Sequence, residues 1–557
     1  MRVTTQVSGA RIFLDSLLAE DAEIAFGMPG THILPIVELL EENTRLRFIN
    51  VRHEASAAAM ADAYGRLTNK PGFCLVTAGP GATNSLTGIA HAYSAGSPLV
   101  HVSGTVPTKS GPGTFHGVDD PTFLEKTFAP VTKLSRTVNS VAEIPAAVHE
   151  CFEKARSGRR GPVHLSLPLN VLTALGKSSK RTTTKKRVQL NPDLSRAKRI
   201  IRASQKPLIL LGEEARGLRN EIVTFAETLR APVISTMNAL GAYPQTSPMF
   251  AGYIEQFWRI HPTALDLLQE ADLVVSIGTR FGTPEVRCID LVSAPDWLFL
   301  TEEKLMRQPG TLKATHLTGD ICSNLMGITQ GLDSAHSREE WARRASERTR
   351  SHSGELGSIV SRNLSVKPIH PALAVQSLSQ HLPNESIICS DSGGNEVWVR
   401  EYLGVRRDCE YLYPGTFGGM GFALPAAIAA SLVRPGSRIL AVAGDGGLLM
   451  SLMELSTLAE QKSNVVMVVL NDSAYGMMWV LQQRKIASLL HPVNFAEVAE
   501  GFGIKAWRVN DPSELSDSYA QAFSMSGPAL VDVAIDYKQR FPYETIMEDF
   551  RRKYPGD

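Results

Sequence analysis

Hydrophobic and polar positions alternate with two periods along most of the chain. Apolar side chains recur at helical spacing over residues 11–20, 33–42 and 56–66, and short, nearly continuous apolar runs such as PGFCLVTAG and SPLVHVSG separate these stretches. Apolar runs of this length are typical of buried strands. Strands that alternate with helices predict a parallel α/β unit over residues 1–175.

The same alternation returns twice further along the chain. A polar, basic stretch at residues 178–187 indicates a linker, and runs such as KPLILLGEEA and ADLVVSIGTR then predict a second unit over residues 190–340. A third unit, over residues 365–540, contains SRILAVAGDGG and NVVMVVLNDSAYG, where each apolar run ends in a turn of small and polar residues. We therefore expect an α/β protein of three doubly wound parallel sheets, with ligands bound at the carboxyl ends of strands.

A glycine-rich turn ends one apolar run of the third unit. Gly444, Asp445, Gly446 and Gly447 stand between RILAVA and a helical pattern. Glycines let backbone N–H groups approach an anion, and a helix N-terminus favours it, so the turn predicts a phosphate site. The carboxylate of Asp445 would repel phosphate unless a cation lies between them, and Mg²⁺ prefers these oxygen ligands. A glycine-rich turn by itself is also common without any ligand.

A second oxygen ligand is expected from the next strand. The apolar run from Asn464 to Leu470 ends in Asn471 and Asp472, and Asp472 follows Asp445 by 27 positions. One helix and one strand of a crossover unit fill this spacing. The two carboxylates and a loop carbonyl would then form one face of an octahedral metal site that holds a diphosphate.

This combination resembles the metal-diphosphate motif of thiamine-diphosphate enzymes of the acetolactate synthase, pyruvate oxidase and 2-hydroxyacyl-CoA lyase family. The resemblance implies that Asp445, Asp472 and the carbonyl of Ala474 bind Mg²⁺. It also implies a set of residues around the diphosphate: Gly444, Gly446, Gly447, Tyr475 and Gly476. The family more often has Asn where Asp472 stands, so this chain adds a negative charge to the site.

The rest of the cofactor site is implied by three further segments. Glu54, in VRHEAS, matches the catalytic Glu that faces the pyrimidine ring, although a Glu at a helix start is also favoured by the helix dipole alone. In YPGTFGGMGFALPA, Met420 matches the apolar wedge that bends the cofactor, and the carbonyl of Gly418 would accept from its exocyclic amine. Gly393 and Asn395 match positions that contact the diphosphate. Met420 is equally explained as core filling when it is taken alone.

The resemblance extends over nearly the whole chain. The segments FGMPGTHILP and VTAGPGATNS of the first unit are similar to acetolactate synthase and its relatives, whereas the middle unit is only weakly similar. The family architecture implies a pyrimidine-binding first domain, a central domain and a diphosphate-binding third domain. It also implies a homodimer or homotetramer, because the family builds each active site from two subunits.

The substrate is less well defined than the cofactor. His116 lies where acetolactate synthase has Phe-Gln-Glu, and an imidazole that titrates near neutral pH is a candidate acid-base group, although a structural histidine fits equally well. Thr31 and Leu481 stand where relatives have Asp and Trp, and both are expected to line the substrate pocket.

We expect decarboxylation of a pyruvate-like 2-oxo acid and transfer of the fragment to a second carbonyl. The alternatives are a 2-hydroxyacyl-CoA lyase or oxalyl-CoA decarboxylase activity, with an acyl-CoA substrate, and a non-catalytic paralogue that only binds the cofactor. The retained Glu54 argues against the paralogue.

Some relatives hold FAD in the middle unit. The corresponding positions here are Gly212-Glu213-Glu214, Ala251-Gly252-Tyr253 and Arg280-Phe281-Gly282, which depart from the relatives' FAD-binding segments. FAD is therefore left open and disfavoured.

Composition narrows the remaining classes. A net charge of +1 and the absence of a basic stripe give no case for nucleic acid. Six scattered cysteines without a CxxC pair indicate neither a disulfide framework nor a cysteine zinc site. The N-terminal residues do not resemble a signal peptide, and no apolar window reaches membrane-spanning length, so we expect a cytoplasmic protein without a membrane partner.

Overall fold

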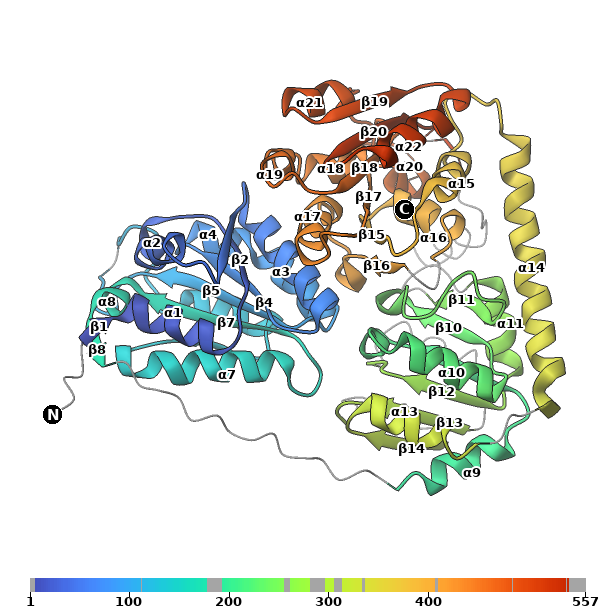
Figure 1. Ribbon diagram of the computed structural model, residues 1–557, viewed down its shortest axis with the longest axis horizontal. Coiled ribbons are helices and arrows are strands. Elements are labelled where there is room, and N and C mark those ends of the chain that lie inside the picture. The colour runs from blue at the N-terminus through green and yellow to red at the C-terminus, as the bar shows by residue number, and fades with distance from the viewer. Residues whose placement is uncertain are drawn as a thin grey trace.

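The chain forms three six-stranded parallel sheets, each flanked by helices, in the computed structural model (Figure 1). The structure describes residues 6–111, 113–177, 193–254, 261–280, 296–304, 313–332, 336–405, 409–482, 484–536 and 538–539. The predicted fold class is confirmed, because every pairing within the three large sheets is parallel. The predicted linker at residues 178–187 lies outside the described residues.

The first sheet has the strand order β3-β2-β4-β5-β7-β6. Its strands are β2 (Ile24–Gly27), β3 (Arg47–Asn50), β4 (Gly72–Val76), β5 (Leu99–Thr105), β6 (Ser135–Thr137) and β7 (Pro162–Pro168). The main helices are α1 (Gly9–Ala19), α2 (Leu34–Glu41), α3 (Glu54–Thr68), α5 (Leu86–Ser94) and α7 (Ile144–Arg156). A short antiparallel pair, β1 (Gln6–Ser8) with β8 (Leu175–Lys177), joins the two ends of this unit.

The third sheet repeats the topology of the first, with the order β16-β15-β17-β18-β20-β19. Its strands are β15 (Ile387–Ser390), β16 (Glu410–Leu412), β17 (Ile439–Gly444), β18 (Val465–Asn471), β19 (Lys505–Val509) and β20 (Ala529–Ala534). The helices are α15 (Pro371–His381), α16 (Gly394–Tyr402), α17 (Ala423–Val433), α18 (Asp445–Leu449), α19 (Glu454–Glu460), α20 (Gly476–Leu481), α21 (Phe495–Gly501) and α22 (Leu515–Ser524).

The central sheet has a different order, β11-β10-β9-β12-β13-β14, which is the order of dinucleotide-binding folds. Its strands are β9 (Pro207–Leu211), β10 (Val233–Thr236), β11 (Phe250–Ile254), β12 (Leu273–Ile277), β13 (Asp296–Thr301) and β14 (Lys313–Thr318). Its helices are α9 (Ser195–Ala203), α10 (Arg219–Leu229), α11 (Pro262–Glu270) and α13 (Ile321–Thr329). The long helix α14 (Glu339–Arg362) runs along the outside of this unit toward the third (Figure 1).

The first and third units share one hydrophobic core. Helices α3 and α17 pack against each other, and both are rich in buried alanines, so their backbones approach closely. A helix that is apolar on all sides is one that is buried on all sides, as α17 is. Among the described residues, no helix is both long enough and apolar enough to span a membrane.

Candidate active site

The third sheet places three predicted loops at one edge. In the order β15-β17-β18, the chain leaves β15 and β17 in opposite directions, which creates the crevice where open α/β sheets bind ligands. Residues 391–395 follow β15, the glycine-rich turn follows β17, and residues 472–476 follow β18. The carboxyl ends of parallel strands meet at this edge, as the sequence predicted.

Two buried carboxyl groups face each other in this crevice. Asp445 begins α18 directly after β17, and its side chain is hydrogen-bonded to that of Asp472. Burial raises the pKa of Asp445 to about 6, and burial together with the charge of Asp445 raises the pKa of Asp472 to about 8. Two neighbouring carboxylates that are buried away from water cost free energy unless a cation lies between them. The pair therefore fits a hard divalent ion such as Mg²⁺.

The loop after β18 is shaped around the same pair. Ser473 has φ +53, and the N–H of Ala474 donates to Oδ1 of Asp472 at 3.1 Å. A Cβ on Gly476 would lie 2.5 Å from Oδ2 of Asp472, so a larger residue there would displace this carboxylate. In the facing turn, a Cβ on Gly446 would lie 2.7 Å from the ring of Tyr475. The glycines therefore allow the two loops to close on each other.

A cavity of about 380 Å³ lies above these loops. The described residues that line it all belong to the third unit. They include every residue of this unit that the sequence assigned to the cofactor, the metal or the substrate: Gly393, Asn395, Gly418, Met420, Gly444, Asp445, Gly446, Gly447, Asp472, Ala474, Tyr475, Gly476 and Leu481. The structure thus brings thirteen predicted positions to one cavity, while their individual roles stay predictions.

Asp391, which was not among the predicted site residues, organises the loop that carries Met420. Its buried carboxylate accepts from the N–H groups of Ser392 at 2.7 Å, Gly421 at 2.9 Å and Ala423 at 3.2 Å. Burial raises the pKa of Asp391 to about 6. The strand-end position of Asp391, directly before Ser-Gly-Gly, is the signal that would have identified it.

The first unit of the same chain supports this loop from behind. Nε2 of His91 in α5 accepts from the N–H of Gly419 at 3.0 Å, and Oγ of Ser94 lies 2.8 Å from Oγ1 of Thr416. Burial lowers the pKa of His91 to about 4, so its imidazole is neutral and accepts near neutral pH. Nothing in the sequence around His91 distinguishes it from a core histidine.

Glu54 lies at the carboxyl end of the first sheet, as predicted. It is the first residue of α3, is buried, and accepts at Oε2 from the side-chain amide of Asn84 at 3.0 Å. A Cβ on Gly81 would lie 3.2 Å from Oε1, so this oxygen faces the glycine turn after β4.

A residue of the third unit holds the turn that directly precedes Glu54. Oε1 of Glu454, in α19 of the same chain, accepts from the N–H groups of Arg52 at 2.9 Å and His53 at 3.1 Å. Its Oε2 accepts from the hydroxyl of Thr457 at 2.6 Å. Glu454 was not predicted from the sequence. The signal that could have identified it is a Glu inside the largely apolar run SLMELSTLAE, and the structure shows this Glu fully buried.

Thr31 and His116, the predicted substrate residues of the first unit, lie on the side of the carboxyl ends of its strands, as Glu54 does, and do not line the cavity. Thr31 is exposed and begins a short 3-10 helix after β2. His116 has φ +63 and stacks on His32 with a ring separation of 5.4 Å, and its carbonyl oxygen would lie 2.6 Å from a Cβ on Gly79. Within one chain, the predicted residues therefore form two separate groups. One lines the cavity of the third unit, and the other lies on the first unit.

Comparisons with known proteins agree with this arrangement. Three family models match: "Thiamine pyrophosphate enzyme, N-terminal TPP binding domain" over residues 7–123, the central domain over residues 194–290, and the C-terminal TPP binding domain over residues 391–533. The chain is 31% identical to the acetolactate synthase of Bacillus subtilis, with 95% of this chain and 93% of the relative covered.

Other relatives are similar over the same length. The chain is 30% identical to the probable acetolactate synthase large subunit of Methanococcus aeolicus, with 95% of this chain and 92% of the relative covered. It is 27% identical to the isozyme 1 large subunit of Escherichia coli, with 96% and 95% covered. The family that the sequence indicated is confirmed: the chain belongs to the thiamine-pyrophosphate enzymes and, within them, to the acetolactate synthase-like proteins.

Proposed function

We propose that this enzyme uses thiamine diphosphate and Mg²⁺ to decarboxylate a pyruvate-like 2-oxo acid and to transfer the fragment to a second carbonyl. The observation that carries the proposal is the single cavity in which the glycine-rich loops surround the buried pair Asp445 and Asp472. A neutral binding pocket would not place two carboxyl groups together away from water.

Asp445, Asp472 and the carbonyl of Ala474 are the proposed Mg²⁺ ligands. The dication would offset the repulsion that, after burial, raises the pKa of Asp472, and it would let these carboxylates lie beside a diphosphate. The proposed diphosphate contacts are Gly393, Asn395, Gly444, Gly446, Gly447, Tyr475 and Gly476. Met420 and Gly418 would hold the pyrimidine end, on a loop that Asp391 and His91 fix in place.

Thiamine diphosphate, when bound, supplies a nucleophilic carbon and an electron sink for decarboxylation. The task left to the protein is to move a proton on the pyrimidine ring, and Glu54 is the proposed residue. Its Oε2 is held by Asn84, and Oε1 faces the turn at Gly81. Because one oxygen of this carboxyl group is held by Asn84, the other oxygen is the one oriented for proton transfer.

The active site is proposed to form between two chains. The cavity is lined by the third unit alone among the described residues, while Glu54, Thr31 and His116 lie on the first unit. Exposed apolar residues of the third unit lie in or next to the segments that line the cavity, namely Phe417, Leu449, Met450, Met453 and Met478. We infer a homodimer, or a homotetramer of such dimers, in which the first unit of one chain completes the site of the other.

The proposed substrate pocket is small and apolar on the side of the third unit. Met477, Met478 and Leu481 of α20 line the cavity beside the metal loop. This lining suits the short apolar group of a pyruvate-like donor. Thr31 and His116 would contribute from the partner chain, with His116 as the acid-base candidate.

We propose that the central unit does not hold FAD. At its switch point, between β9 and β12, Glu213 is buried and lies 3.6 Å from Arg159 and 3.4 Å from Arg280. Burial raises the pKa of Glu213, and that of the adjacent Glu214 to about 7. Two carboxyl groups where a dinucleotide places its diphosphate disfavour the anion. Of the third FAD segment, Phe281 and Gly282 lie outside the described residues.

A substrate panel tests the proposed function. Purified protein with thiamine diphosphate and Mg²⁺ is assayed against pyruvate, larger 2-oxo acids, oxalyl-CoA and a 2-hydroxyacyl-CoA, with product detection and a visible spectrum. We expect turnover of a 2-oxo acid and no flavin absorbance. Turnover of the acyl-CoA compounds alone would favour the lyase alternative.

A further inference from the structure

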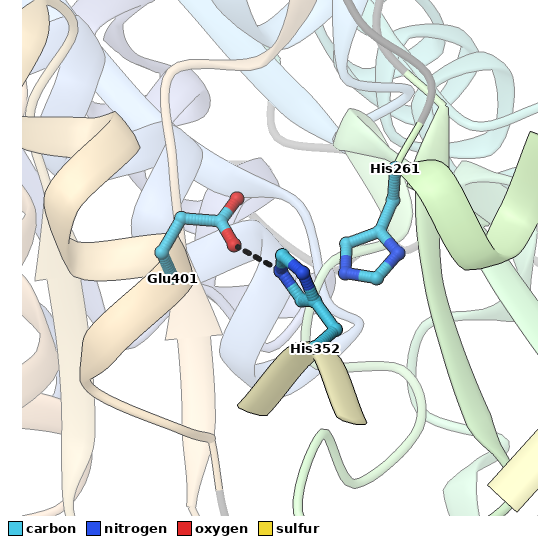
Figure 2. A group of neighbouring side chains, drawn as sticks. All are labelled: His261, His352 and Glu401. Carbon is cyan, nitrogen blue, oxygen red and sulfur yellow. Dashed lines mark ion pairs between the residues drawn. The ribbon is translucent and has the colours of Figure 1, made fainter. Parts of the chain in front are cut away.

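Two histidines and a glutamate meet where the central unit, α14 and the third unit come together (Figure 2). His261 caps the N-terminus of α11, His352 lies in α14, and Glu401 lies in α16. One ligand atom from each lies within 4.8 Å of the other two. The side chains of His352 and Glu401 are 11% and 3% exposed, and His261 is buried.

Strand β11 makes room for this cluster and orients its carboxylate. Gly252 has φ +105, and a Cβ there would lie 2.3 Å from Cγ of His261, so only glycine leaves space for the imidazole. The hydroxyl of the next residue, Tyr253, donates to Oε1 of Glu401. Oε2 of Glu401 then faces His352 at 3.8 Å from Nε2. A hydrogen bond to one oxygen of a ligating carboxylate, which orients the other oxygen, is a usual outer-shell feature of metal sites.

Helix α14 is fixed against the same strand. Oγ1 of Thr349, one turn before His352, lies 3.2 Å from the carbonyl of Phe250 and donates to it. Oε2 of Glu355 lies 3.9 Å from Nδ1 of His352, on the side away from Glu401. Figure 2 shows the imidazole of His352 between His261 and the carboxylate of Glu401.

We propose that His261, His352 and Glu401 bind one Zn²⁺ or a similar divalent transition cation, which ties the central unit to the third. Two imidazoles and one carboxylate are the ligands that Zn²⁺ takes, whereas Mg²⁺ prefers oxygen alone. In a tetrahedral zinc site the ligand atoms lie about 3.3 Å apart, so small side-chain rotations bring these three onto one ion. Water would complete the coordination.

The cation would act on the active site through α16. This helix carries Glu401 near its end, and four residues at its start line the cofactor cavity, namely Gly394, Asn395, Glu396 and Trp398. None of the three ligands belongs to the proposed Mg²⁺ site, so the two metals are separable by experiment.

Metal titration of the intact protein tests this inference. Chelator-treated protein is returned to saturating thiamine diphosphate and Mg²⁺ and then titrated with Zn²⁺ by calorimetry. We expect one Zn²⁺ per chain and a rise in the unfolding temperature. His352→Gln and Glu401→Gln should each weaken Zn²⁺ binding by at least about 100-fold. The control His381→Gln, at the end of α15, should bind Zn²⁺ as the unchanged protein does.

The ligand set can be read without any variant. Cu²⁺ bound to the unchanged protein should give an electron paramagnetic resonance spectrum with coupling to two imidazole nitrogens. A folded protein that takes up no Zn²⁺, equal affinity in His352→Gln and Glu401→Gln, or a Cu²⁺ spectrum with oxygen ligands only would each overturn the site. In that case the three side chains only pack the central unit and α14 against the third unit.

Discussion

Glu54 is held in a defined position although it begins a helix, where a glutamate is usually exposed. Its burial and its bond from Asn84 fix which oxygen faces the glycine turn. The dipole of α3 alone would favour a negative charge at this position without specifying its direction. Catalytic roles at the residue scale therefore depend on the contacts of individual atoms.

Glu54→Gln separates binding from turnover. The amide keeps the shape and the bond from Asn84 but cannot exchange a proton, so we expect kcat to fall at least about 100-fold. The dissociation constant of thiamine diphosphate, measured by calorimetry, should stay nearly unchanged. The control is Glu41→Gln, at an exposed position of α2, which should leave kcat unchanged. Full turnover in Glu54→Gln would remove the carboxyl group from the mechanism.

Asp445 and Asp472 should respond differently to substitution. Asp445→Ala removes a ligand oxygen, and we expect Mg²⁺ and thiamine diphosphate to be lost together, with affinity reduced at least about 100-fold. Asp472→Asn keeps a ligand oxygen and removes the charge that its neighbour repels, so binding should stay within about tenfold. Calorimetry at fixed Mg²⁺ measures both. An unchanged cofactor affinity in Asp445→Ala contradicts the metal assignment.

At the scale of elements, α19 controls the start of α3. Glu454 accepts from two half-buried backbone N–H groups in the turn before Glu54. The third unit therefore positions a residue of the first unit within one chain.

Glu454→Ala should weaken both stability and turnover. Two unsatisfied N–H groups cost about 1–3 kcal/mol each, and the turn that carries Glu54 should shift. We expect a lower unfolding temperature and a lower kcat with little change in cofactor affinity. Glu454→Gln retains the accepting oxygen and should restore both values. If Glu454→Ala lowers stability alone, Glu454 has no positioning role.

Strands β5 and β7 carry a buried histidine pair that makes stability depend on pH. Nδ1 of His101 and Nδ1 of His164 are 2.8 Å apart, and burial lowers the pKa of His101 to about 3 and that of His164 well below its usual value. The native state keeps both rings neutral, whereas the unfolded chain binds protons below about pH 6.5.

The contribution of this pair is therefore complete above about pH 6.5 and decreases as the pH falls toward 3, by about 1.4 kcal/mol per pH unit for each histidine. Unfolding temperatures at pH 7 and pH 5 should differ less in His164→Gln than in the unchanged protein. An equal difference in both proteins would show that this pair does not carry the pH dependence.

For the whole molecule, the division of the site between units predicts complementation between chains. In a mixed dimer of a Glu54→Gln chain and an Asp445→Ala chain, one site carries both defects and the other carries neither. An equal mixture, unfolded and reassembled together, should recover about a quarter of the full activity, although each variant alone is inactive. No recovery, with mixed dimers demonstrated by affinity tags, would place the site within one chain.

The sequence by itself determined the fold class and predicted which loops of the third unit meet at one cavity. Continuous apolar strands that end in turns such as Gly444–Gly447 and Asp472–Gly476 can lie together only at one edge of a parallel sheet, so local pattern was sufficient there. The resemblance of the motif around Asp445 and Asp472 to thiamine-diphosphate enzymes added the cofactor, Glu54 and Met420 were matched from it, and the family is confirmed.

Tertiary structure decided what depends on contacts between distant segments. Asp391, His91 and Glu454 act through backbone groups far away in the chain, and no spacing in the sequence encodes such bonds. The cluster of His261, His352 and Glu401 is assembled from three elements separated by 91 and 49 positions. They come together because α14 packs against both the central and the third unit. Contacts between elements that are far apart in the sequence therefore determine which of these polar side chains are neighbours.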